Sequence, residues 1–566
     1  MPPRALAAAT EARPAAPTRR LWLVAAIVFS FAAAAQVWLG AAGDVSWMIT
    51  INEKWLDGGT PYVDFVETNP PASILIYMPA VALARWLSAP PEAMVAASGL
   101  IAAAAAFAFA AAILRRAGLL AGARALSLGL ALAALVIVPG RAFAERDFFA
   151  ALCGLPYLAL CAARAARAPV GAGAALAAGL GAGAMIAIKP FYALVLVAAA
   201  PSLTRRGGVA AAFRASEHYA AAVVVVAYAA LIAWLFPAYG ADVLPAVAAA
   251  YLPVRETALR LLANAGVVAW IALAIALAAI AGRDLKRPLV ATPALASLGA
   301  LAAYFVQGKG WLYHAYPALA FLVLALAAAV AARPPPPRRL CVAAGAAAAT
   351  ALGTLLFHWP ALLAAVGAAL AAGAVLLVAR RDREAAREGA AALGEAAAAA
   401  MLVAVFALYA PPRDWPDAAF VNAVADLGER PRLASVAEGL GIGFPLVREV
   451  GGVWAQRTQG MLLTAGARRL MAEHPGDRAL AERLAPIIAR DRDMVVEDIL
   501  RNRPDGVLVS DVGPGFHAWA MNDPKIAAAL ADYRPQARTA GRSSVVELYV
   551  RKDAFGLRPT LSEVGE

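Results

Sequence analysis

Long, uncharged apolar stretches recur along most of this sequence and constrain its fold more than any other feature. Between Leu21 and Ala410 these stretches follow one another closely. A helix needs about 20 mainly apolar residues to cross a hydrocarbon core about 30 Å thick. Hydrophobic residues make up 62% of the 566 residues and charged residues only 16%, which argues against an ordinary water-soluble fold. We therefore predict a polytopic α-helical membrane protein.

Thirteen transmembrane helices are predicted from the apolar stretches. They are 21–42, one within 72–114, 119–138, 148–165, 169–187, 190–203, 217–237, 259–281, 288–306, 313–332, 340–357, 361–379 and 391–410. The segment 72–114 is ambiguous because Pro90-Pro91 divides it, and two crossings there would reverse the topology downstream. Cytoplasmic loops carry an excess of Arg and Lys, and a single crossing, after a re-entrant or interfacial first piece, keeps most loop cations on that side. We thus expect a cytoplasmic N-terminus and an outward-facing C-terminus.

The N-terminal apolar run could also be a secretory signal peptide. Arg19 and Arg20 precede it and alanines resemble a cleavage site, but the run continues through Trp38. We therefore expect an uncleaved first helix after a cytoplasmic tail, 1–20.

The net charge and the positions of the cysteines both fit a membrane protein, and they argue against a nucleic-acid-binding protein and a disulfide- or zinc-stabilised one. The net charge is +12, but the cations cluster between apolar runs, so we predict no nucleic-acid partner. The three cysteines, Cys153, Cys161 and Cys341, lie in or beside predicted membrane helices without CxxC or Cys/His spacing. We predict no disulfide and no structural metal.

The composition changes sharply after Tyr409, where the sequence PPRDWPD opens a segment rich in Arg, Asp and Glu. No apolar run there is long enough to span a membrane. Strand-like stretches (432–436, 506–510 and 544–550) alternate with helix-like ones (465–473, 477–488 and 524–531). We predict a membrane domain, 21–410, and a small periplasmic α/β domain, 411–566, with too few strands for an independent Rossmann enzyme.

Polar residues are densest in the predicted outer loop 43–71, directly after the first helix. The string DVSWMITINEKWLDGGTPYVDFVETNPP runs from Asp44 to Pro71. It resembles the first outer loop of the GT-C glycosyltransferases, the group that includes protein O-mannosyltransferases and lipid A aminoarabinose transferases. In that family an acidic residue follows the first transmembrane helix, a Gly-x-x-x-Tyr-x-Asp segment comes next, and a Pro-Pro pair opens the following apolar helix.

The resemblance implies roles for the acidic residues of this loop. Asp44 occupies the place of the family's catalytic carboxylate, although such a residue can also simply end or cap a helix. Asp64 or Glu67 occupies the second acidic position. Asn69 departs from the pattern, because better-known relatives often carry Lys or His before the Pro pair, so the contacts with the donor stay open.

Two further outer loops carry candidate substrate-binding residues. Glu145 and Arg146, followed by Asp147, precede a membrane helix and either form an anchoring ion pair or bind substrate. Lys309 and His314 lie in the segment Gln307-Gly-Lys-Gly-Trp-Leu-Tyr-His314, whose aromatic residues are also typical of a membrane interface.

Isolated cations in the outer loops are further candidates for contacts with a phosphate. Lys189, before Pro190, either snorkels to water or contacts a phosphate. Arg255, with Arg260 nearby, adds positive charge after Tyr251.

The resemblance therefore predicts an inverting glycosyltransferase whose sugar donor is a polyprenyl phosphate and whose acceptor is a cell-envelope glycan, a lipid or a protein. Asp44 is the expected general base, Lys189, Arg255 or Lys309 would stabilise the phosphate, and His314 would orient a substrate. We predict no cofactor or metal. The alternatives are a transporter or flippase of lipid-linked sugars, for which mid-helix charges and repeated halves are not evident, and a non-catalytic membrane scaffold.

Overall fold

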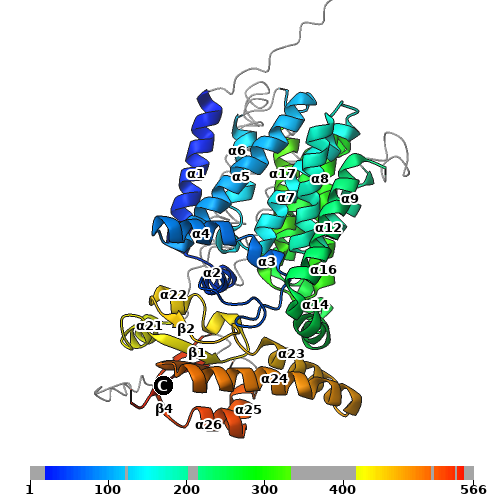
Figure 1. The fold of residues 1–566 in the computed structure, drawn as a ribbon. Helices are drawn as coiled ribbons and strands as arrows, with labels where there is room; N and C mark the ends of the chain where they lie inside the picture. The colour runs from blue at the N-terminus through cyan, green and yellow to red at the C-terminus, as the bar shows by residue number, and fades with distance from the viewer. Residues whose placement is uncertain are drawn as a thin grey trace, which may run out of the picture.

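The computed structural model describes residues 19–121, 125–201, 214–332, 416–511, 515–541 and 545–553. These residues form a helical bundle with a smaller, sheet-containing C-terminal domain at one end of it (Figure 1). The predicted combination of a helical membrane domain and a small α/β domain is confirmed at this level.

The bundle and its loops contain helices of very different lengths. The α-helices are α1 (Arg19–Leu39), α2 (Gly43–Leu56), α3 (Ala72–Leu75), α4 (Met78–Leu87), α5 (Pro91–Arg116), α6 (Ala125–Val136), α7 (Arg146–Ala165), α8 (Ala172–Ile188), α9 (Ala193–Ala199), α12 (Ser216–Leu235), α13 (Leu244–Ala246), α14 (Ala258–Leu262), α15 (Ala265–Ala281), α16 (Pro288–Gln307) and α17 (Tyr316–Ala332). Short 3-10 or π segments are η1 (Gly140–Ala142), η2 (Pro190–Tyr192), η3 (Tyr239–Val243), η4 (Val247–Tyr251), η5 (Gly282–Lys286) and η6 (Leu312–Ala315).

Seven helices of the described residues are long and apolar enough to cross a membrane, which makes this a multi-pass membrane protein. They span Arg19–Leu39, Pro91–Arg116, Arg146–Ala165, Ser216–Leu235, Ala265–Lys286, Pro288–Gln307 and Leu312–Ala331. The runs predicted at 119–138, 169–187 and 190–203 contain shorter apolar helices, and those at 340–357, 361–379 and 391–410 lie outside the described residues. The number thirteen therefore stays a prediction.

The divided segment 72–114 contributes one long helix. Ser88 ends α4 in the left-handed conformation, and Pro91 starts α5 at a position where a proline fits the first turn. In Figure 1, α4 lies across the ends of α1 and α5 and does not run alongside them. This arrangement agrees with an interfacial first piece and a single crossing.

Glycines let α8 and α12, two helices in extensive contact, pack closely. A Cβ added at Gly179 would lie 2.3 Å from the backbone oxygen of Glu217, and one at Gly183 would lie 2.7 Å from that of Ala221. Small residues at helix interfaces allow such approaches in membranes, where packing holds helices together.

The C-terminal domain is a five-stranded mixed sheet with helices. Its strands are β1 (Arg432–Val436), β2 (Val453–Trp454), β3 (Gly506–Asp511), β4 (Tyr533–Ala540) and β5 (Val545–Arg551), in the order β2-β1-β3-β5-β4. The helical segments are α21 (Ala418–Ala425), η7 (Leu440–Ile442), α22 (Leu446–Glu449), α23 (Leu462–Glu473), α24 (Arg478–Asn502), α25 (Phe516–Asn522) and α26 (Pro524–Ala529). The strands β2, β1 and β3 are parallel, whereas β5 is antiparallel to β3 and β4.

Replacing Gly179 by alanine is predicted to destabilise the bundle. The added methyl group meets backbone atoms of α12, so the helices must separate, and overpacking of this kind costs about 1–3 kcal/mol. We expect a melting temperature several degrees lower for the purified protein in detergent. Gly173→Ala in the same helix is the matched control, because a Cβ there meets nothing within 4 Å. Equal melting temperatures for the two variants would contradict the packing argument.

Candidate active site

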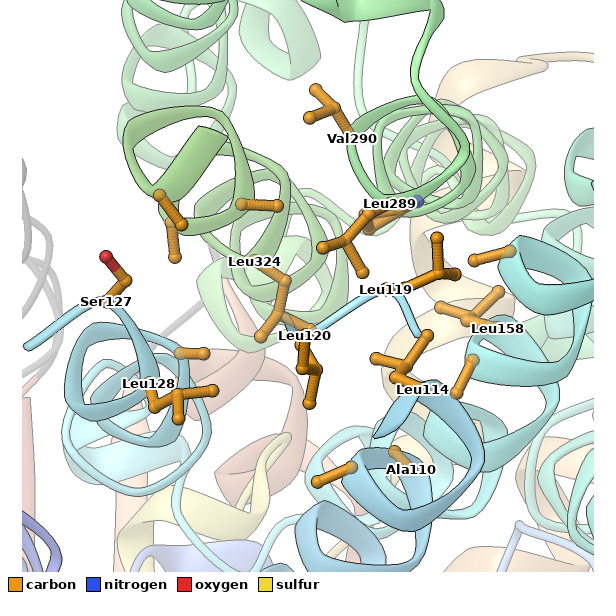
Figure 2. Close-up of a pocket in the computed structure, with 18 of the residues that line it drawn as sticks. Ala110, Leu114, Leu119, Leu120, Ser127, Leu128, Leu158, Leu289, Val290 and Leu324 are labelled. Carbon is orange, nitrogen blue, oxygen red and sulfur yellow. The ribbon is translucent and has the colours of Figure 1, made fainter. Parts of the chain in front are cut away.

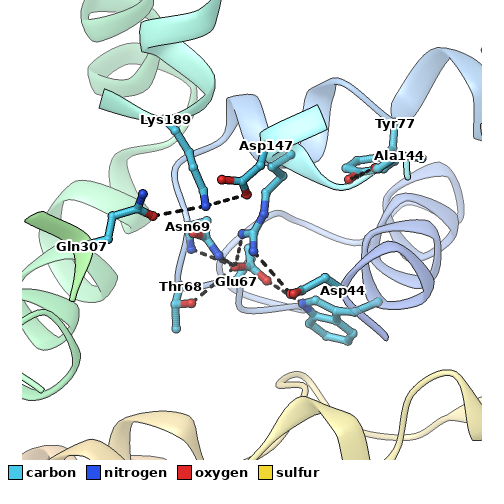
Figure 3. Close-up of polar contacts among 11 residues, drawn as sticks. Asp44, Glu67, Thr68, Asn69, Tyr77, Ala144, Asp147, Lys189 and Gln307 are labelled. Carbon is cyan, nitrogen blue, oxygen red and sulfur yellow. Dashed lines mark hydrogen bonds and ion pairs between the residues drawn. The ribbon is translucent and has the colours of Figure 1, made fainter. Parts of the chain in front are cut away.

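Asp44, Glu67 and Arg146 come from three separate segments and meet at the end of the bundle that faces the C-terminal domain (Figure 3). Arg146 begins α7, and its side chain is only 3% exposed. Its Nη2 atom lies 3.3 Å from Oδ1 of Asp44, and its Nη1 atom lies 3.9 Å from Oε1 of Glu67. A buried guanidinium thus lies between two carboxylates.

Asp44 does not act as a helix cap. The cap residue of α2 is Ala42, and the Asp44 carboxylate, in the first turn, is directed toward Arg146. The partial positive charge of a helix N-terminus favours a carboxylate at this position. The Asp44 side chain is 18% exposed, so it combines an ion pair with access from outside the protein.

Glu67 is held firmly by its neighbours. Its Oε2 atom accepts a hydrogen bond of 2.5 Å from Nε1 of Trp47, which lies one turn after Asp44 on α2. Its Oε1 atom accepts from the backbone N–H of Asn69 at 2.8 Å and from the Asn69 side chain. With both oxygens engaged and the side chain buried, Glu67 orders the loop and balances the charge of Arg146.

Lys189 forms a second buried ion pair beside the first. Its Nζ lies 2.7 Å from Oδ2 of Asp147 and 3.3 Å from Oε1 of Gln307, as Figure 3 shows. The hydroxyl of Tyr192 donates to the other oxygen of Asp147. Asp147 is the next residue after Arg146 in α7, so the two ion pairs lie side by side at the start of this helix.

Several buried polar atoms around these ion pairs have no hydrogen-bond partner among the described residues. They are Nε and Nη1 of Arg146, Oε2 of Glu145, the Tyr313 hydroxyl and Nδ1 of His314. Buried polar groups are nearly always paired with protein, water or a ligand. Bound water or a polar ligand would satisfy these atoms.

Glu145 lies just before α7, outside the apolar span. Its burial, together with the nearby negative charge of Asp44, raises the pKa of its carboxyl group well above the ordinary value. This shift favours the protonated form of the Glu145 carboxyl group.

Other predicted binding residues are occupied elsewhere. Asp64 is exposed, and its carboxylate accepts from the backbone N–H of Thr60 at 2.8 Å, which stabilises a turn. Arg255 is exposed and donates to the Val306 carbonyl. The structure does not bring either residue into contact with the Arg146 ion pairs.

Lys309 is also engaged by backbone groups. Its Nζ donates to the carbonyls of Tyr251 and Val254, at 2.6 Å each. Burial, with a contribution from Arg255, lowers the pKa of Lys309 to about 8.

The binding residues predicted from the sequence do not include Trp47, Tyr192 or Gln307, and they include Asp147 only beside Arg146, as a candidate ion-pair partner of it. In the structure Asp147 pairs with Lys189 instead. Two of these four residues carried a signal. Trp47 lies three residues after Asp44 and thus on the same helix face, and Asp147 adds a charge where a membrane helix begins, which is costly unless the charge is paired.

Two cavities lie away from this cluster. The one in Figure 2, about 340 Å³, is lined by apolar side chains such as Leu114, Leu158 and Leu324 at the other end of the bundle. The second, about 1140 Å³, lies between the 61–66 loop, residues 241–246 and α24. Arg287 is the one charged residue among the described residues that line the first cavity, and no carboxylate or histidine joins it there, so this cavity lacks a candidate general base.

The fold and the polar cluster define a class: a polytopic membrane protein with a small C-terminal sheet domain and buried ion pairs at the end of the bundle that faces it. Two solved structures share the fold along nearly the whole chain, both of ArnT from Cupriavidus metallidurans, one bound to undecaprenyl phosphate and one in the apo state. Identity is 17% for both, with TM-scores of 0.56 and 0.54. The matches cover 96% and 95% of this chain and 100% and 99% of the ArnT chains.

No family model matches this sequence, and no curated protein matches it. At 17% identity the likeness to ArnT shows a shared fold, and that fold is the one that the resemblance of residues 44–71 predicts.

Removing the charge of Lys189 is predicted to destabilise the protein. In Lys189→Met the buried Asp147 carboxylate loses its counter-charge, and breaking a buried ion pair from one side typically costs about 3–5 kcal/mol. We expect a clearly lower melting temperature in detergent. The double variant Lys189→Met/Asp147→Asn removes both charges and should recover much of the loss. A single variant as stable as wild type would show that the pair contributes nothing.

Proposed function

We propose that this protein is a GT-C type glycosyltransferase that moves a sugar from a polyprenyl-phosphate donor to an acceptor at the outer face of the bacterial inner membrane. The support is the resemblance of residues 44–71 to the family's first outer loop and the fold shared with ArnT, which has been solved with undecaprenyl phosphate. The acceptor class is a cell-envelope glycan, a lipid or a protein.

The observation that carries the proposal is the different state of the four clustered carboxylates. Glu67 and Asp147 are buried and accept hydrogen bonds at both carboxylate oxygens, and Glu145 is buried with a raised pKa. Asp44 combines a negative charge, partial exposure and a neighbouring cation with unused donors. It is therefore the carboxylate best placed to serve as a general base.

The reaction is a single displacement with inversion. The acceptor hydroxyl attacks the anomeric carbon and gives its proton to Asp44, while the bond from that carbon to the phosphate oxygen breaks and the polyprenyl phosphate leaves with the electron pair. Arg146, whose Nε and Nη1 atoms have no hydrogen-bond partner among the described residues, stabilises the negative charge that develops on the phosphate by donating to it. Lys189, which pairs with Asp147 directly after Arg146 in the chain, adds a second positive charge to the site. His314 lies beside Tyr313 and is proposed to orient a substrate.

The topology that fits this reaction places the chemistry outside the cytoplasm. We assign 1–20 to a cytoplasmic tail, 21–410 to the membrane domain with the catalytic outer loop 43–71, and 411–566 to a periplasmic domain. The excess of loop Arg and Lys on the opposite side supports this orientation.

Replacing the proposed base by its amide should abolish transfer. Asp44→Asn keeps the size of the side chain but cannot accept the proton, so we expect transfer to fall by about 10²–10⁴-fold. The assay uses purified protein in nanodiscs, a panel of synthetic polyprenyl-phosphate sugars, and membrane extract as acceptor. Donor binding should persist.

Asp57→Asn is the matched control, because Asp57 follows the other end of α2 and pairs with the exposed Arg85. Transfer that survives in Asp44→Asn would remove Asp44 as the base. If the wild type binds the donor but transfers sugar to no acceptor under any condition, a transporter would be favoured.

We also propose transfer without a metal cofactor. The guanidinium of Arg146 lies between the Asp44 and Glu67 carboxylates, where a divalent cation bridging them would have to bind. We expect transfer rates in EDTA to match those in Mg²⁺ or Mn²⁺. A rate that collapses in EDTA and returns on adding either ion would contradict this assignment.

A further inference from the structure

One arginine of the C-terminal domain forms hydrogen bonds with α2, the helix that carries Asp44. Arg448, in α22, donates from Nη1 to Oε2 of Glu53 at 2.6 Å and from Nη2 to Oε1 of the same carboxylate at 3.2 Å. Its Nε pairs with Glu92, and Nη1 also lies 3.3 Å from the Thr50 hydroxyl. The side chain is 14% exposed, so these contacts are largely shielded from water.

The three partners of Arg448 belong to two different elements. Glu53 and Thr50 lie on α2, whereas Glu92 lies in the first turn of the membrane-crossing helix α5. One guanidinium therefore joins the C-terminal domain, α2 and the membrane bundle. Bidentate pairing with a carboxylate restricts orientation as well as distance, which a point charge does not.

The N-terminal half of α2 is packed against the same domain. The Trp47 ring packs edge-on against Phe444 with centroids 5.4 Å apart, and a Cβ at Gly43 would lie 3.1 Å from the Phe444 carbonyl. Near the other end, Nζ of Lys54 donates to the Gln456 carbonyl at 2.5 Å. The C-terminal domain thus contacts both ends of α2. Asp44, in the first turn of this helix, lies 3.3 Å from Arg146, and the proposed reaction requires the two side chains to stay close.

We propose that Arg448 is a positioning residue for transfer: it sets the orientation of α2 and thereby holds Asp44 against Arg146. The proposal rests on the function proposed above. Glu53 lies nine residues after Asp44, about 13 Å along one rigid helix, so a rotation or tilt at the Arg448 end moves the Asp44 carboxylate. A misplacement of about 1 Å at a reacting group can cost about 10²-fold in rate.

The simpler explanation is that Arg448 merely helps to hold the two domains together. Another arginine of the C-terminal domain provides a comparison, because it makes a more exposed interdomain ion pair and none of its hydrogen bonds or ion pairs among the described residues is with α2. Arg490 in α24 lies 3.3 Å from Asp242 in η3. If adhesion were the whole role, neutralising Arg448 or Arg490 would have effects of the same kind.

The experiment compares Arg448→Gln with Arg490→Gln in the full-length protein in nanodiscs. We expect kcat of Arg448→Gln to fall by about 10–100-fold while the KM for the donor stays within about twofold, because donor contacts are intact. Hydrogen exchange of the α2 backbone amides should become faster in this variant. Arg490→Gln should keep both the wild-type kcat and the wild-type exchange.

A charge-swapped double variant distinguishes the loss of this ion pair from a general folding defect. In the double variant Arg448→Glu/Glu53→Arg, the arginine introduced on α2 faces the carboxylate introduced on α22 and the carboxylate of Glu92. One cation again lies between two carboxylates, so kcat and α2 exchange should recover relative to either single variant. Unchanged α2 exchange in Arg448→Gln, or equal losses in both glutamine variants, would overturn the proposal. Wild-type protein without transfer would overturn the proposed function, and hydrogen exchange would still decide whether Arg448 holds α2.

Discussion

The buried charge of Arg146 is the constraint on which the end of the bundle beside the C-terminal domain depends. A guanidinium that is 3% exposed at the mouth of a membrane helix is tolerated only with counter-charges around it. Asp44 arrives from the helix that follows α1, and Glu67 arrives from the loop beyond it. The ion pairs therefore require the segment 43–71 to fold back over the bundle and do not leave it as a free loop.

The C-terminal domain closes this arrangement from the other side. The backbone N–H of Val66 donates to the Arg457 carbonyl at 2.7 Å, so the domain contacts the loop one residue before Glu67 as well as α2. Figure 1 shows α2 between the bundle and the domain. The C-terminal domain thus has a structural task, because both acidic partners of Arg146 lie on segments that it touches.

How much of this could be predicted depends on how local each signal is. Apolar length identifies α1, α5, α7 and α12 without knowledge of the fold. The strands β1, β3 and β5 follow from short β-rich stretches, but β2 has only two residues, and β4 carries Arg534 and Pro535, which hide its strand character. The residues of the candidate site divide in the same way, into those with a local signal in the sequence and those without one. Asp44 and Glu67 follow from the resemblance of residues 44–71 to a family's outer loop, whereas Arg146 and Lys189 are conspicuous as charged residues beside apolar helices. Their pairing joins residues 102 or 42 positions apart, which one sequence does not reveal. For the same reason Asp64 and Arg255 could not be separated from the others, since their exposure is a property of the folded loops.

Charge balance connects the ion pairs to the proposed reaction. In the resting site the Asp44 carboxylate neutralises part of the Arg146 charge at 3.3 Å. During transfer Asp44 gains a proton and becomes neutral, while the departing phosphate gains a negative charge. Arg146 then loses one anionic partner as another forms, so its charge is used in both states without rearranging the protein. Fixed dipoles and charges that need no reorganisation are the most effective electrostatic catalysts, and the buried pairs of Glu67 and Lys189 keep this guanidinium in place.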